Sequence, residues 1–289
     1  MFDIRYHIAS LVAVFLALTV GILLGSVIVD KGVLVDQQKA LVQSLEARQN
    51  DLQEKNRSLS RENTLLEKFE EESQSVINDK LKEKRIALIV TGDAPDEDQN
   101  KLRQILEQAG ASTTIISTKT FSEKFKDRGN RKKLSKFFPQ EDLSKEELRM
   151  RVLGKLVLET VTPTDTAFLN ELAGLGFIKV RSIENLPAGQ VILFGGTRAG
   201  KSTVEDVDVP LIQQIKELDT QVIGVENSDT KNSYIDAYQE QGISTIDNAD
   251  QIAGKIALVF VLLGEEEGHY GIKSSAEKLL PSLSSVPED

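Results

Sequence analysis

The sequence predicts an α/β protein in three parts: a single N-terminal transmembrane helix (residues 1–30), a coiled-coil stalk (31–84) and a Rossmann-like three-layer domain with a mainly parallel sheet (85–289). Three observations predict this organisation. An uncharged apolar run fills residues 8–29, leucines then recur at seven-residue intervals, and beyond residue 84 short apolar stretches alternate with helical ones.

Composition excludes several classes of function. A formal net charge of -10 over 289 residues disfavours nucleic acid as a partner. The absence of cysteine excludes disulfides, zinc knuckles and thiol nucleophiles. Two histidines (His7 and His269) and two methionines (Met1 and Met150) remain for imidazole or soft-metal chemistry.

The apolar run at 8–29 predicts a membrane anchor. Its 22 residues would span roughly 33 Å as a helix, enough to cross the hydrocarbon core of a lipid bilayer. A buried core helix or a cleaved signal peptide would be an alternative, but the apolar stretch of a signal peptide is shorter. We therefore expect a retained membrane helix.

Small residues recur at every fourth position of this run, as in membrane helices that pack closely against one another. These residues are Ala9, Ala13, Ala17, Gly21 and Gly25. Self-association through Ala13, Ala17, Gly21 and Gly25 is one interpretation, and the ordinary abundance of small residues in membrane helices is the other. Because an i, i+4 row drifts around the helix, only two or three of them can share one contact.

Positive charge does not decide the orientation of the anchor, because Arg5 lies on one side and Lys31 and Lys39 lie on the other. A seven-residue N-terminal tail is simple to leave in the cytoplasm, and long domains translocate largely regardless of charge. We expect the N-terminus inside and residues 31–289 outside the cytoplasmic membrane.

The stretch after the anchor is polar, and its leucines predict a two-stranded parallel coiled coil, hence a homodimer. Leucines at d and polar residues at several a positions define a weak seam, in which Glu62 would face Glu67 of the partner helix. An exposed single helix or an antiparallel hairpin remains the alternative. The seam residues are Val42, Leu45, Leu52, Asn56, Leu59, Asn63 and Leu66.

Residues 85–289 alternate between strand and helix patterns, which favours a parallel sheet covered by helices. Helices are expected at 100–110, 211–219 and 234–242, with two or three more within 121–180, including one near 145–161. The apolar run at 256–264 is too short to cross a bilayer, so we expect a buried helix ended by Gly264. The expected strands are 86–90, 113–117, 191–196, 221–226 and 243–247.

Residues 195–202, GGTRAGKS, match the phosphate-loop pattern through Gly195, Gly200, Lys201 and Ser202. A working phosphate loop places its Lys and Ser at the start of a helix. Here the following TVEDVDVPL is rich in branched and acidic residues, which favours an extended loop and a new helix near Pro210. We therefore expect a tight turn that binds no nucleotide or other cofactor.

No catalytic set emerges elsewhere in the sequence. A Ser-His-Asp arrangement would have to use His269, and neither a G-x-S-x-G elbow nor an H-E-x-x-H helix is present. We expect a protein that is not an enzyme.

Two stretches carry a family resemblance. RYHIASLVAVFLALTVGILLGS at 5–26 and GISTIDNADQIAGKIALVFVLLGEEEGHYGIKSSAEKLLP at 242–281 resemble the copper-transport protein family of the mycobacterial MctB type, to which the corynebacterial envelope protein SteB also looks related. The resemblance implies a membrane-anchored, envelope-facing protein. It links that protein to copper homeostasis and, in relatives, to envelope assembly and cell division with a partner protein.

Copper ligands are scarce in this chain. Cu(I) prefers thiolate and thioether ligands and Cu(II) imidazole, while residues 31–289 hold only Met150 and His269. His269 is a weak metal candidate. It is expected to join a polar cluster in the tail with Asp247, Asn248, Asp250 and Tyr270, although capping of the next helix explains the first three equally well.

Three hypotheses follow from the sequence. The first is a dimeric envelope scaffold or interaction module, and the second is a component of copper efflux. The third is an ATP-dependent enzyme.

Overall fold

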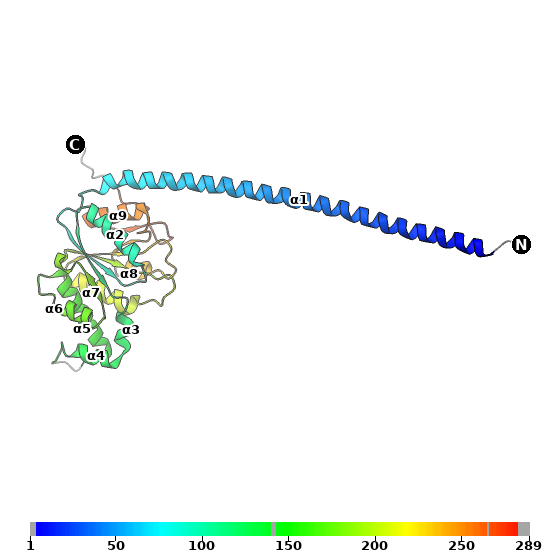
Figure 1. Ribbon diagram of the computed structural model, residues 1–289. Helices are drawn as coiled ribbons and strands as arrows, with labels where there is room; N and C mark the ends of the chain where they lie inside the picture. The colour runs from blue at the N-terminus through cyan, green and yellow to red at the C-terminus, as the bar shows by residue number, and fades with distance from the viewer. Residues whose placement is uncertain (1–3, 140–142, 265, 283–289) are drawn as a thin grey trace. The chain divides into compact units, whose positions relative to one another are not determined.

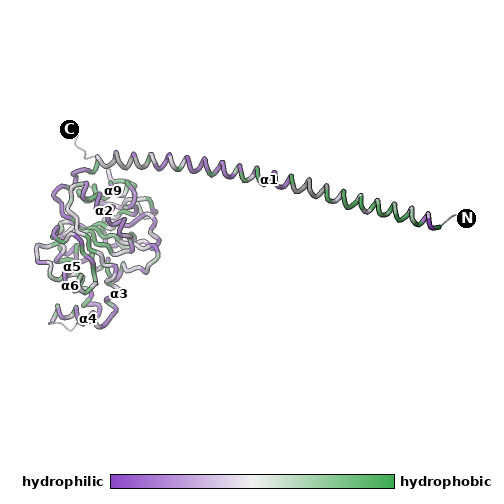
Figure 2. The backbone as a smooth tube through the Cα atoms, in the orientation of Figure 1, coloured by the Kyte–Doolittle hydropathy of each residue, from purple (hydrophilic) through white to green (hydrophobic). Residues whose placement is uncertain are grey.

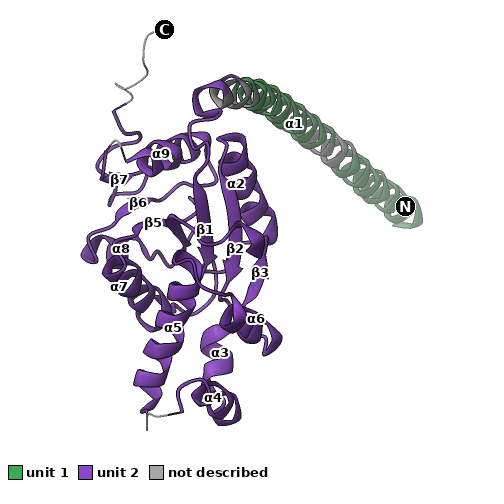
Figure 3. Cartoon of the chain, turned by 90° about the vertical axis from the view of Figure 1, so that its left-hand side faces the viewer, with its two compact units in different colours: residues 1–69 green, residues 70–289 purple. Residues whose placement is uncertain are grey.

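The computed structural model describes residues 4–139, 143–264 and 266–282. The chain divides into two compact units, Met1–Phe69 and Glu70–Asp289 (Figure 3). Most of the first unit is one helix, and the second is an α/β domain (Figure 1).

The helix α1 (Ile4–Ile77) runs without interruption through 74 residues. Its N-terminal part, Ile4–Val27, is long and apolar enough to cross a membrane, and none of it is buried by the rest of the chain. Figure 2 shows the change along α1 from a hydrophobic N-terminal part to a hydrophilic remainder. Within the described residues, one candidate membrane helix is thus present, and it lies where the sequence predicts it.

The expected coiled-coil seam lies on α1 as an exposed row. Leu45, Leu52 and Leu59 are 54%, 60% and 56% exposed, and Val42 is 52% exposed. The side chain of Leu66 lies outside the described residues. Pairing of this row with a second helix stays a prediction.

The last turns of α1 belong to the α/β unit. Ile77 and, just beyond the helix, Leu81 are fully buried in the core on one face of the sheet. The chain then enters the first strand at Arg85.

The described residues form a seven-stranded sheet in the order β3-β2-β1-β4-β5-β6-β7. Every neighbouring pair is parallel except β2 and β3. This confirms the mainly parallel sheet. The strands are β1 (Arg85–Val90), β2 (Ser112–Ser117), β3 (Lys179–Arg181), β4 (Gln190–Phe194), β5 (Gln221–Val225), β6 (Ser244–Ile246) and β7 (His269–Tyr270).

Helices cover both faces of the sheet and give three layers (Figure 3). Successive side chains of a strand point to opposite faces of the sheet, so β1 contributes to the core on each face. Ile86, Leu88 and Val90 lie in one core, and Ala87 and Ile89 lie in the other. The first core contains the end of α1, α2 (Asp96–Gln108) and α9 (Ile252–Leu263). The second contains α3 (Phe121–Lys126), α4 (Arg128–Ser135), α5 (Lys145–Val161), α6 (Ala167–Gly174), α7 (Val209–Glu217) and α8 (Ile235–Glu240).

Two helix predictions are refined by the structure. The described part of 121–180 holds four helices, because Asp127 ends α3 and its side chain then caps α4 by accepting a hydrogen bond from the Asn130 amide. The buried helix at the end of the domain is α9, and Gly264 ends it at φ +82° in the left-handed region.

The prediction of an extended loop between Ser202 and the helix near Pro210 is wrong from Val204 onward. Val204–Asp208 forms a π-helical turn that continues directly into α7. Val207 is buried in the core and Asp208 is fully buried, so packing beneath the sheet edge selects the helical turn over the preference of branched residues for extended backbone.

Candidate functional site

Open parallel sheets bind ligands beyond the carboxyl ends of their strands, where the chain changes direction across the sheet. In this protein that point lies between β1 and β4, since β2 extends the sheet on one side and β5 on the other. The loops 91–95 and 195–200 follow these two strands. They make up the first place to look for a site.

This crevice is closed by the chain itself. The amides of Thr91 and Gly92 both donate to the Phe194 carbonyl, at 3.0 and 3.1 Å. A Cβ added to Gly92 would lie 2.1 Å from the Gly196 carbonyl oxygen, so only glycine permits the contact. The remaining cavity is about 10 Å³, which is at most one water molecule.

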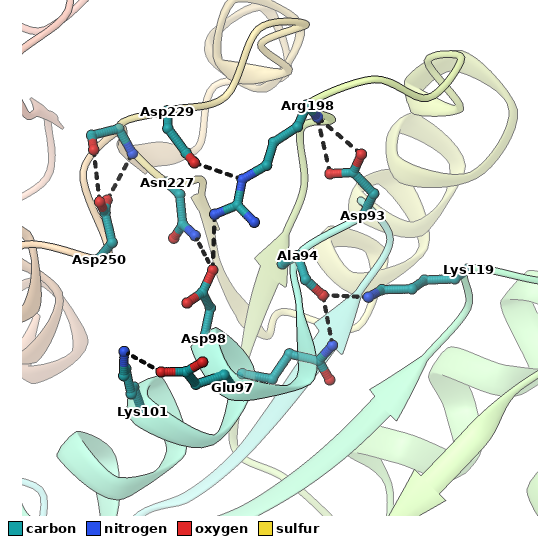
Figure 4. A network of polar contacts seen from close by, with 12 residues as sticks. Asp93, Ala94, Glu97, Asp98, Lys101, Lys119, Arg198, Asn227, Asp229 and Asp250 are labelled. Atoms are coloured by element: carbon teal, nitrogen blue, oxygen red, sulfur yellow. Dashed lines mark hydrogen bonds and ion pairs between the residues drawn. The ribbon is translucent and has the colours of Figure 1, made fainter.

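The phosphate-loop look-alike already holds an anion, which comes from the chain itself. The Asp93 carboxylate accepts from the Arg198 amide at 3.0 and 2.9 Å and from the Ala199 amide at 3.3 Å (Figure 4). In a phosphate loop such amides would cradle phosphate oxygens. Here the carboxylate of the neighbouring loop takes their place.

The remaining phosphate-loop residues are not arranged for nucleotide binding. Lys201 and Ser202 are exposed, and neither lies in a helix. Gly195 packs so closely against Tyr238 that an added Cβ would lie 2.0 Å from the Tyr238 hydroxyl. Thr197 donates through Oγ1 to the Gly200 carbonyl at 3.0 Å, which closes the loop as a tight turn.

Arg198 connects the loops at this edge of the sheet (Figure 4). Its guanidinium pairs with Asp229 at 2.7 Å and with Asp98 of α2 at 3.0 Å. Asp98 also accepts from Asn227, just after β5, at 2.7 Å. The hydrogen bond to Asp229 is the main cause that raises the pKa of Arg198, so this cation is held charged between acids.

A buried carboxyl group, Asp208, lies beneath the same loops. It is fully buried, and its Oδ1 accepts hydrogen bonds from Thr91, at 2.5 Å, and from Tyr238. Burial raises the pKa of Asp208 to about 6, although the two hydrogen bonds oppose this. Burial and the neighbouring Asp208 also raise the pKa of Tyr238.

The residues of the predicted polar tail cluster come together only in part. The alternative prediction, that Asp247, Asn248 or Asp250 caps α9, is wrong. Gln251 is the N-cap, and no side chain caps this helix. Asp247 instead accepts from the amides of Ile272 and Lys273, at 2.8 and 3.0 Å. The Asp247 carboxylate therefore holds the tail after β7 rather than the start of α9.

The other members of the cluster have separate roles. Asp250 accepts from the amide and hydroxyl of Ser228, at 2.7 and 2.6 Å. Asn248 is fully buried, and its side-chain atoms meet no hydrogen-bond partner within the described part of the chain. His269 bonds through Nδ1 to the Thr245 hydroxyl at 3.0 Å, and Tyr270 lies beside it on β7. No described residues bring three His, Cys, Asp or Glu side chains into one potential metal site.

The small residues expected to pack in the membrane lie exposed on α1 in the described part of the chain. A Cβ added at Gly21 or Gly25 would meet no atom within 4 Å. Ala13 and Ala17 are exposed on the same helix.

Comparison with known proteins places the chain in a family. A family model described as "Copper transport outer membrane protein, MctB" matches residues 1–281. The chain belongs to the MctB family. Relatives named "Copper transporter MctB" from Mycobacterium tuberculosis (strain ATCC 25618 / H37Rv) and Mycobacterium bovis are 26% identical, with 94% of this chain and 96% of each relative covered. The MctB-like sequence thus includes both the apolar helix and the α/β unit.

Several residues that connect the loops at the carboxyl edge of the sheet were not predicted from the sequence. Asp93 was recognisable in principle, because it follows a buried strand beside the switch point, whereas the GGTRAGKS pattern drew attention to the other loop. Glu226, fully buried at the end of β5, accepts from Ser233 at 2.8 Å and pairs with Lys273. No local pattern signals that pair, since 47 residues separate its members.

Proposed function

We propose that this MctB-family protein is a membrane-anchored dimeric scaffold that presents its α/β unit as an interaction module to a protein of the cell envelope. The observation that carries the proposal is the row of exposed leucines on α1, at seven-residue intervals. Each is more than half exposed in the single chain. Burial of a leucine side chain is worth about 1.5–3 kcal/mol, so a second helix would stabilise the row substantially.

The polar seam residues support two parallel chains. Asn56 and Asn63 occupy a positions between Leu52, Leu59 and Leu66. Paired amides are tolerated across a parallel dimer and specify its register. The partner proposed for α1 is therefore a second copy of the chain.

Cross-linking tests this pairing directly, because the chain contains no cysteine of its own. In the full chain in detergent, Leu52→Cys at a d position is expected to form a disulfide-linked dimer under mild oxidation. Glu54→Cys, at an f position on the opposite face, is the matched control and should stay monomeric on denaturing gels. Equal cross-linking at both positions, or none at Leu52→Cys, would refute a parallel seam.

The proposed placement is the cytoplasmic membrane, with the N-terminus inside and the α/β unit outside. The long uncharged run of α1 and the short N-terminal tail support it. Alkaline phosphatase fused after Asp289 is expected to be active, while a cytosolic reporter at the same place should be silent. The reverse pattern would contradict the placement.

The proposal assigns no enzymatic role to the protein. The closed crevice between β1 and β4 and the internal anion in the GGTRAGKS loop support that assignment.

Copper handling is the second candidate, because both relatives are named copper transporters. His269 offers one imidazole whose Nδ1 is already bonded to Thr245, and Met150 lies on α5. The scaffold role predicts that calorimetry of the full chain with Cu(I) or Cu(II) gives binding weaker than about 1 μM, with no change in His269→Ala. Tight stoichiometric binding that His269→Ala abolishes would favour copper handling.

A further inference from the structure

A cavity of about 420 Å³ lies at the carboxyl end of β2, one strand away from the closed switch point. The first turn of α2, the loop after β2 and the edge strand β3 form its walls. Unlike the crevice between β1 and β4, it is large enough for a small ligand.

Three cations line this cavity, together with a single carboxylate. Lys119 comes from the loop after β2, Lys179 and Arg181 come from β3, and Asp96 is the acid. In the part of the chain that the structure describes, none of the three cations forms an ion pair. This concentration of positive charge contrasts with the net charge of -10 of the protein.

Two of the three cations are positioned by neutral oxygen atoms rather than by carboxylates. Arg181 donates to the side-chain oxygens of Asn100 and Gln99 of α2, both at 3.0 Å. Lys119 Nζ donates to the Ala94 carbonyl (Figure 4). Amide and carbonyl oxygens fix the geometry of a cation without neutralising it, so the charges remain available to a ligand.

The pKa of Lys119 is lowered in this environment. Its partial burial is the main cause that lowers its pKa, and the charges of Lys179 and Arg181 lower it further against the opposing effect of Asp96 and Asp93. Like charges that share a cavity repel, and a bound anion would relieve that repulsion.

Neutral features of the cavity also suit an anion with a small organic body. Ser117 supplies a hydroxyl, and Ile115 and Val180 supply apolar surface. The N-cap of α2 is Pro95, which has no side-chain cap hydrogen bond, and the first turn of this helix lines the cavity.

We propose that this cavity is a binding site for a phosphate monoester. The three cations outnumber the two carboxylates that act on Lys119, those of Asp96 and Asp93, so the site is net positive and attracts a phosphate dianion more strongly than a singly charged carboxylate. The site lies at the edge of the sheet where this fold class binds ligands, on the side of β1 away from β4. A phosphate monoester occurs both on soluble metabolites and on lipid headgroups, and the experiment separates these sources.

Calorimetry of the full chain in a neutral detergent tests the site with two probes, glycerol 3-phosphate and dihexanoyl phosphatidic acid below its micelle concentration. Both carry the same monoester. Binding of both identifies the phosphate group as the determinant, and binding of the second alone identifies a lipid ligand. Affinity should fall as salt is raised, because screening weakens the attraction of exposed charges.

Two lysine variants supply the specificity test. Lys119→Gln and Lys179→Gln should each weaken binding about tenfold, while Lys231→Gln, which removes an exposed lysine outside the cavity lining, should leave it unchanged. Unchanged urea midpoints would show that the variants remain folded. Absence of binding by both probes, or equal affinity in all three variants, would overturn the proposal.

Discussion

Replacement of Asp208 by asparagine should remove a loss of stability that the native protein undergoes as the pH rises to neutral. Asp208 is fully buried, and its pKa rises from 3.8 in a model compound to about 6. Each pKa unit corresponds to about 1.4 kcal/mol, so ionising this group in the folded state costs about 3 kcal/mol.

The sign follows from proton binding. Between pH 3.8 and about 6 the folded state keeps the proton on Asp208 while the unfolded chain has lost it. The contribution of Asp208 is therefore fully favourable below this window and is lost as the pH rises through it. Asparagine has no such transition, and its Oδ1 can still accept from Thr91 and Tyr238.

Urea unfolding of native protein and Asp208→Asn measures the effect. Tyrosine fluorescence is a suitable probe, because the chain lacks tryptophan and three of its four tyrosines lie in the α/β unit. The stability of the variant relative to native protein should increase by about 3 kcal/mol from about pH 4 to about pH 7. Asp236→Asn on the exposed side of α8 controls for the lost negative charge.

A stability difference that does not change with pH would refute the reasoning, as would one that favours native protein more strongly at neutral pH. A difference in stability that is equal at every pH and adds to the pH-dependent change would have a separate cause. The asparagine Nδ2 would lie where the Asp208 Oδ2 now has no partner, and an unpaired buried donor costs about 1–3 kcal/mol at every pH.

Three further substitutions test the closed switch point. Gly92→Ala should lower the free energy of unfolding by about 3 kcal/mol, because its Cβ would meet the backbone at Gly196; urea midpoints measure this, and a loss below about 0.5 kcal/mol would contradict the geometry. Asp93→Ala should lower the free energy of unfolding by about 1 kcal/mol, because the exposed amides of Arg198 and Ala199 exchange the carboxylate for water, and an unchanged midpoint would show that the carboxylate does not hold the loop. Lys201→Ala should leave thermal stability unchanged with and without ATP; an ATP-dependent rise in melting temperature of native protein that the variant loses would restore the nucleotide hypothesis.

Residues with strong local patterns were predictable from the sequence. The apolar run of β1 and the helix α5 (Lys145–Val161) lie where periodicity places them, because a buried strand and an amphipathic helix leave regular spacing. The edge strands β3 and β7 have three and two residues, too few to show any period. Their position depends on pairing with β2 and β6, which only the folded chain reveals.

The candidate site was less predictable, for a related reason. GGTRAGKS is a local pattern, but the group that occupies its backbone amides is Asp93, about 100 residues earlier in the chain. The capping expectation for Asp247 failed because its carboxylate binds amides 25 and 26 residues later. Contacts of this separation depend on topology, and a single sequence contains no periodic signal for them.

The length of β7 has a consequence for how the sheet meets other polypeptides. His269–Tyr270 pairs with β6 and stands last in the strand order, so it forms one edge of the sheet. A strand of two residues offers few unpaired backbone groups to a foreign strand, and this limits edge-to-edge aggregation.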